Sequence, residues 1–138
     1  MKKFLFFAAM FAAVISLTMT SCEGQEAGDV LTGTWAYNVE AKKSGGIYEC
    51  VTFSGKDAFA FERCIYNANG SIHVGPDKLV GTYVIEGNTF TATMHYEGDE
   101  QQHVNKYEFA IQGKTLTAKL IEGGIFYPAG TTIVYTKQ

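Results

Sequence analysis

The chain has 138 residues, of which 46% are hydrophobic, and its 11 basic and 14 acidic side chains give a net charge of −3. This length is enough for one domain with a sizeable core. The acidic balance and the single arginine, Arg63, exclude the basic surface that nucleic-acid binding needs, so no nucleic-acid partner is expected.

The first 22 residues have the layout of an export signal. Lys2 and Lys3 precede a near-continuous apolar run at 4–15, and small or hydroxylated residues then lead to Cys22. The run is shorter than the roughly 18–20 residues that a spanning helix needs, which favours a cleaved signal over a transmembrane anchor. The layout resembles bacterial lipoprotein signals, which are cut before the cysteine so that its thiol and amine can be acylated. We therefore expect residues 1–21 to be removed and the lipidated Cys22 to hold the protein to a membrane of the cell envelope.

The lipidated cysteine and the residues after it, 22–30, are expected to form a flexible tether, because they are small and polar. Loss of the two signal lysines lowers the basic count from 11 to nine against 14 acidic residues, a net charge of −5. Glu23, Glu26 and Asp29 resemble the acidic export signal of surface-displayed lipoproteins in some Gram-negative bacteria, although a solvated linker explains them equally well. The expected location is the outer membrane, facing either the periplasm or the cell surface.

From residue 31 to the end, the pattern predicts β-strands. Apolar and polar residues often alternate, β-branched and aromatic residues are dense, and turn residues recur at short intervals. Gly87-Asn88 and Gly113-Lys114 have the composition of two-residue hairpin loops. No segment between strands has a useful length of helical periodicity. The expected strands cover residues 33–40, 47–54, 58–67, 79–86, 89–97, 104–112, 115–121 and 131–137.

Short links without crossover helices make consecutive strands antiparallel neighbours. Eight such strands most economically close on themselves, which removes exposed edges. The predicted fold is therefore all-β, a small antiparallel up-and-down eight-stranded barrel over residues 31–138. The alternation also predicts an aromatic core. Its expected members include Phe53, Phe59, Phe61, Tyr83, Phe90, Ala92, Met94, Tyr107, Phe109 and Ala118.

The same alternation bears on the two remaining cysteines, Cys50 and Cys64. If Val51 and Phe61 share the inner face, their strands pair with an even residue sum, and both cysteines then lie on the outer face. They would be opposite each other or one diagonal step apart. An even pair in an exported domain favours a disulfide, and two buried free thiols are the alternative.

Gly33-Thr34-Trp35 resembles the Gly-x-Trp motif of lipocalins and their calycin relatives. In that family the tryptophan closes one end of an eight-stranded barrel and a basic residue of the last strand packs over it, which implies these roles for Trp35 and Lys137. Residues 81–88 and 109–116 resemble strand-turn-strand phrases of small bacterial lipocalin-like lipoproteins. The chain lacks the Thr-Asp-Tyr triplet, the C-terminal helix and the usual arginine of the family. It therefore resembles a minimal lipocalin-like domain, unless the motif is an ordinary strand start with a core tryptophan.

Glu49 and Arg63 carry charge on the inward face of neighbouring strands. With a residue sum of 112 they face each other beside the pair Val51 and Phe61. A charge inside a barrel is costly unless it is paired. The resemblance implies that such a group holds a ligand carboxylate, and a structural ion pair near an open end is the alternative. Tyrosines could supply further donors: Tyr37, Tyr83, Tyr107 and Tyr135.

The segment Gly123–Gly130 is unusually apolar for a loop, with Ile, Phe and Tyr between glycines and a proline. It fits a lid over the barrel mouth, a contact for a partner or membrane, or extra core at the closed end.

No serine, histidine or acidic residue falls in a nucleophile-elbow or zinc-type pattern, so we expect neither an enzyme nor a metal or cofactor. His95 and His103 flank an acidic loop and are interpreted as exposed polar residues, with a weak metal site at the rim of the barrel as the alternative. The expected function is a lipid-anchored envelope protein whose barrel binds a small apolar or amphipathic ligand. The alternative is a non-catalytic interaction module with a packed barrel, whose loops contact an envelope protein, a protease or a glycan.

Overall fold

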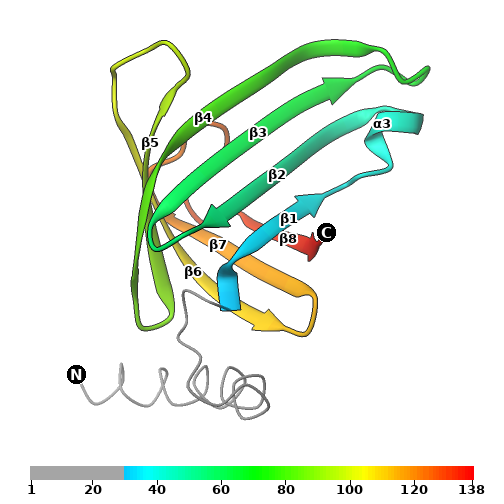
Figure 1. The fold of residues 1–138 in the computed structure, drawn as a ribbon. Coiled ribbons are helices and arrows are strands. Elements are labelled where there is room, and N and C mark those ends of the chain that lie inside the picture. Colours follow the sequence, from blue (N-terminus) through cyan, green and yellow to red (C-terminus); the bar gives the residue numbers. More distant parts are fainter. Residues whose placement is uncertain (1–29) are drawn as a thin grey trace.

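Eight antiparallel strands follow one another around a closed barrel in the computed structural model, which describes residues 30–138 (Figure 1). The first strand pairs with both the second and the last, which closes the sheet. The predicted fold class is therefore confirmed. The predicted signal, the lipidated Cys22 and the tether as far as residue 29 lie outside the described residues. The elements are β1 (Gly33–Tyr37), α3 (Ala41–Ser44), β2 (Gly46–Ser54), β3 (Ala58–Tyr66), β4 (Ile72–Glu86), β5 (Thr89–Tyr96), β6 (His103–Gln112), β7 (Thr115–Glu122) and β8 (Thr132–Lys137).

Hairpin chemistry sets most of the connections. Gly87-Asn88 and Gly113-Lys114 form two-residue turns, and both glycines have a φ near +60° that a side chain would disfavour. These turns and the one at 55–57 lie at one end of the barrel, together with Val30 and Leu31. We call this the closed end. The opposite end, which carries α3 and the connections at 67–71, 97–102 and 123–131, we call the mouth (Figure 1).

Two strand ends differ from the prediction by more than one residue. β1 ends at Tyr37 because Asn38 adopts a left-handed φ of 55° and donates from its side chain to the carbonyl of Ile47, 2.9 Å away. The short α3 follows, which the periodicity did not predict. β4 starts at Ile72 instead of 79, because residues on both sides of Gly75-Pro76 pair with β3 through register shifts.

Aromatic rings fill the closed end. The fully buried Phe53 meets Phe59, Tyr83 and Phe90 edge-on, with ring centroids 5.0–5.3 Å apart. Inward positions alternate with outward ones as predicted, so the core comes from every strand. Its buried members include Leu31, Trp35, Val51, Phe53, Phe61, Leu79, Phe90, Ala92, Met94, Phe109, Ile111, Leu116, Ala118 and Tyr135.

A smaller cluster lies outside the barrel, where α3 covers β1 and β2. Ala41 of α3 is fully buried against Ala36 and Tyr48, with Cys50 and Tyr66 at the margin. This cover explains how Tyr48 is buried on a face that the alternation directs to solvent. No helix among residues 30–138 is long and apolar enough to cross a membrane.

The disulfide prediction is wrong for this structure, because Cys50 and Cys64 are both free thiols. Cys50 pairs with Glu62 across β2 and β3, whereas Cys64 pairs with Tyr48, so the cysteines are diagonal neighbours on the outer face. Diagonal positions are about 7–8 Å apart, beyond the reach of a disulfide without backbone movement.

Both thiols are therefore expected to be alkylated after unfolding in the absence of a reductant. Peptide mapping by mass spectrometry checks this directly. A Cys50–Cys64 crosslink that disappears only with reductant would contradict the register of β2 and β3.

Candidate functional site

The mouth of the barrel holds a charged pair inside an apolar wall. Glu49 of β2 and Arg63 of β3 are direct cross-strand partners beside Val51 and Phe61, so the predicted register is confirmed. Glu49 is fully buried (0% exposed) and Arg63 is half-buried. No ion pair within 4.0 Å joins these two side chains, and the only such pair among the described residues is Lys78 with Glu62.

The lid, which we define as Gly123–Gly130 between β7 and β8, folds into this mouth. The Phe126 ring stacks on Phe61, with centroids 5.4 Å apart and planes 19° apart. The Arg63 guanidinium carbon lies 4.8 Å from the centre of the Phe126 ring and 5.9 Å from that of Tyr127. Of the three predicted alternatives for this segment, the structure shows the one in which it covers the mouth.

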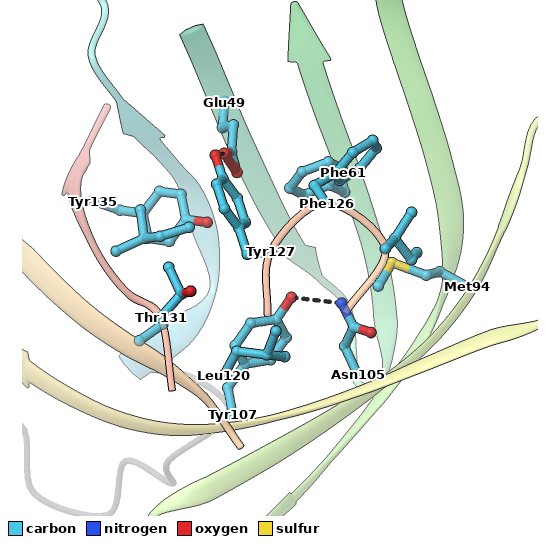
Figure 2. Close-up of a pocket in the computed structure, with 13 residues that line it drawn as sticks. Glu49, Phe61, Met94, Asn105, Tyr107, Leu120, Phe126, Tyr127, Thr131 and Tyr135 are labelled. Atoms are coloured by element: carbon cyan, nitrogen blue, oxygen red, sulfur yellow. Dashed lines mark hydrogen bonds between the residues drawn. The ribbon is translucent and has the colours of Figure 1, made fainter. Parts of the chain in front are cut away.

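Tyr127 carries the polar contact of the lid. Its hydroxyl donates a short hydrogen bond to Glu49 Oε2, and Figure 2 shows its side chain pointing at the carboxyl group with Tyr135 alongside. The other carboxyl oxygen of Glu49, Oε1, is buried and has no hydrogen-bond partner among the described residues, and the same holds for Arg63 Nε. The lid therefore supplies a direct hydrogen bond to the buried carboxyl group.

Asn105 of β6 fastens the start of the lid. Its Oδ1 accepts the Gly124 amide at 3.0 Å, and its amide nitrogen donates to the Tyr107 hydroxyl at 3.0 Å (Figure 2). At the other end of the lid, the Gly130 amide donates to the Leu120 carbonyl at 2.7 Å. The lid is thus held at both ends and through Tyr127 in the middle.

With the lid in place, the space left inside the mouth is small. The cavity has a volume of about 20 Å³, which is room for one water molecule. Its wall consists of Glu49, Phe61, Met94, Asn105, Tyr107, Ala118, Leu120, Ile125, Phe126, Tyr127, Thr131, Ile133 and Tyr135.

Burial sets the protonation of these groups. It raises the pKa of Glu49, against the opposing effects of the Tyr127 hydrogen bond, the Arg63 charge and Tyr135. Burial, with the hydrogen bond to Glu49, raises the pKa of Tyr127 to about 12. Burial also raises the pKa of Tyr107. The pKa of Tyr135 is raised by burial and, as a further cause, by the negative charge of Glu49. All three phenols are therefore neutral at physiological pH.

The pH dependence of stability follows from Glu49. Between the ordinary pKa of 4.5 and its raised value, the folded protein keeps a proton that the unfolded chain releases. Stability therefore falls as the pH rises through this window, by about 1.4 kcal/mol for each unit by which the pKa is raised. The groups around the Glu49 carboxyl are Arg63 on β3, Tyr107 on β6, Tyr135 on β8 and Tyr127 in the lid. On β1, Tyr37 is the cross-strand partner of Glu49.

Glu49→Gln is expected to remove this decrease in stability with rising pH. The free energy of unfolding of the variant should therefore increase relative to that of the wild type as the pH rises. Urea unfolding at a series of pH values measures it. Parallel profiles for the two proteins would show that the carboxyl titrates normally.

The structure separates the predicted site residues into two groups. Glu49 and Tyr107 line the cavity, and Arg63 contacts the lid above it. Tyr83 lies deeper, against Phe53 in the closed-end core, and does not line the cavity. Successive inward residues of a tilted strand lie in different layers of the barrel, and Tyr83 falls in a layer nearer the closed end.

Trp35 and Lys137 meet at the closed end, as the motif implies. They are cross-strand partners on β1 and β8, and Lys137 Nζ lies 5.3 Å from the centre of the fully buried Trp35 ring. The Trp35 indole donates to the carbonyl of Leu31 at 2.7 Å. These contacts fix the first described residues to the barrel.

Sequence reasoning missed Asn105 and the role of Tyr127. Asn105 has the same parity as Tyr107 and Phe109, so a polar residue on the inner face of β6 was visible in the pattern. The partner of Tyr127 was not, because a loop has no periodicity that directs a side chain. In the part of the chain described, no three His, Cys, Asp or Glu side chains gather as a metal site.

A search against protein-family models, curated proteins and solved structures finds no match to this chain.

Proposed function

We propose that this protein is a lipid-anchored component of the cell envelope, whose barrel binds a small amphipathic molecule at the mouth when the lid swings out. One observation carries the proposal: Phe126 and Tyr127 occupy the mouth as a bound molecule would. They place a ring on Phe61 and Arg63 and a hydroxyl group on Glu49.

The wall beneath the lid suits such a ligand. Met94, Leu120 and Ile133 offer an apolar surface, whereas Glu49 and Arg63 offer charge at one side. Binding sites of this kind combine a mostly apolar lining with a few placed polar groups. The lid starts at Gly123-Gly124 and ends at Gly130, and glycine tolerates the backbone rotations that a hinge needs.

Another observation favours the second candidate, an interaction module with a packed barrel. The cavity of about 20 Å³ is too small for any ligand while the lid is closed. Large apolar side chains are also exposed around the mouth, at the end of β1, on the β1–α3 connection and at the start of β4. They are Tyr37, Val39, Ile72 and Val74.

The double variant Phe126→Ala/Tyr127→Ala tests the proposal. It removes the two rings from the mouth, so it is expected to bind the uncharged fluorescent probe N-phenyl-1-naphthylamine at least tenfold more tightly than the wild type. In the wild type only the fraction of molecules with an open lid can bind the probe, which lowers the apparent affinity. The variant has no rings to fill the mouth, so its apparent affinity for the probe should be higher. Val84→Ala, at an exposed position on the outer face of β4, is the matched control and should behave as wild type.

Native mass spectrometry of the protein isolated from its own host's envelope complements this titration. A bound small molecule that is lost on Arg63→Ala would support the site. If the lid variant keeps the wild-type far-UV circular dichroism yet binds no probe, the barrel is solid and the interaction module is the better conclusion.

A further inference from the structure

We propose that the molecule accepted at this mouth is an uncharged, planar aromatic compound with a hydroxyl group, a phenol in the broad sense. The inference rests on the proposed function and names its ligand class. The lid occupies the site in the closed state, so the contacts that it makes show what chemistry the site satisfies.

The first requirement is a flat ring. Phe61 presents its face to Phe126 in a stacked arrangement, and the Arg63 guanidinium lies over the same ring at 4.8 Å. Aromatic stacking and cation–π contacts both favour a planar π system over a flexible alkyl chain. A second ring, that of Tyr127, lies next in the chain and 5.9 Å from the same guanidinium carbon. The space that the lid fills therefore accommodates two aromatic rings.

The second requirement is a hydrogen-bond donor. Glu49 is fully buried, its Oε2 accepts from a phenol, and its Oε1 has no partner among the described residues. The Oε2 atom loses its donor when Tyr127 leaves, so a ligand that displaces the lid must bring a donor of its own. A hydrocarbon without one would leave the carboxyl group unsatisfied.

The third requirement is neutrality. An anionic ligand would place its charge beside Glu49, and a cationic ligand would place its charge beside Arg63, which is the direct cross-strand partner of Glu49. Asp77, the cross-strand partner of Arg63 on β4, adds a further negative charge at the rim. A neutral hydroxyl donor is compatible with all three charges, whereas a carboxylate, the ligand group that the family resemblance implied for this site, meets two acidic neighbours.

Three matched probes test this class at neutral pH in the Phe126→Ala/Tyr127→Ala protein: naphthalene, 2-naphthol and 2-naphthoate. They share the fused rings and differ only in the polar group. Isothermal titration is expected to show 2-naphthol binding about tenfold or more above naphthalene, as one charge-assisted hydrogen bond would give. It should also show 2-naphthoate binding more weakly than 2-naphthol.

Replacing Glu49 by leucine in the same lid variant identifies the acceptor. The preference for 2-naphthol over naphthalene should then disappear while naphthalene still binds, because only the hydrogen bond is lost. Far-UV circular dichroism and the retained naphthalene affinity show that this triple variant is folded. If it loses the fold, Glu49→Gln in the lid variant replaces it, and a reduced preference for 2-naphthol is expected.

The outcomes separate the inference from the proposed function. Equal binding of naphthalene and 2-naphthol, or tightest binding of 2-naphthoate, overturns the phenol class and leaves a ligand-binding mouth. If neither these three probes nor N-phenyl-1-naphthylamine binds the folded lid variant, the proposed function fails and the inference with it.

Discussion

Trp35→Ala is expected to lower the free energy of unfolding by about 3–5 kcal/mol, the range for a large aromatic side chain removed from a core. Trp35 is fully buried at the closed end, where Lys137 lies over its ring and its indole nitrogen donates to the carbonyl of Leu31. The cavity left behind would be enclosed by strands of a closed sheet, which cannot collapse easily to fill it. Urea denaturation followed by far-UV circular dichroism measures the loss.

Trp35→Phe is the matched control for the indole hydrogen bond. It keeps an aromatic ring and removes the N–H group, so the Leu31 carbonyl loses its partner at a cost of about 1–3 kcal/mol. A cost as large as that of Trp35→Ala would mean that the hydrogen bond outweighs the packing. If neither variant is destabilised, Trp35 does not close the barrel.

Above the raised pKa of Glu49, where its carboxyl group is ionised, Tyr127→Phe is expected to weaken closure of the lid by about 1.5–3 kcal/mol, the usual value of a hydrogen bond to a charged group. The change removes a single oxygen atom, the lid hydroxyl that donates to the buried Glu49 carboxyl. Amide hydrogen exchange gives the readout. The Gly124 and Gly130 amides, which bond to Asn105 and Leu120, should exchange faster, whereas the Phe109 amide deeper in the barrel should not change.

A double-mutant cycle with Glu49→Gln isolates this contact. In the glutamine background the same Tyr127→Phe change breaks only a neutral hydrogen bond, so its effect on lid exchange should fall to about 0.5–1.5 kcal/mol. Identical effects in the two backgrounds would show that Tyr127 holds the lid by ring packing alone. Tyr107→Phe is a useful second comparison, because the Tyr107 hydroxyl accepts from Asn105 on β6.

The fold could be predicted from the sequence because strand alternation and turn chemistry act locally. Val51 and Phe61 must both face the inside of the barrel, and this requirement limits β2 and β3 to a few pairing registers. The structure has the register in which Glu49 lies opposite Arg63. What alternation could not supply was the exact offset of the cysteines. A diagonal step and a direct pair have the same parity, yet only the direct pair is within reach of a disulfide.

The features that sequence reasoning did not predict depend on contacts between distant segments. α3 has four residues, too few for a periodic pattern, and it is held by burial of Ala41 against Ala36 and Tyr48. The lid was visible as an apolar loop, but its place in the mouth depends on partners on β2, β3 and β6. Tyr83 shares the inward parity of the site residues, and only its depth along the barrel removes it from the mouth.

The closed end also gives the barrel a direction. Leu31 enters beside Trp35, so a chain that leads to an anchor at Cys22 departs from the end opposite the lid. In the proposed lipid-anchored protein the tether would then leave the entrance unobstructed, because the two lie at opposite ends of the barrel. A flexible tether lets the entrance face either the water or the bilayer, so both are routes by which a molecule would reach it.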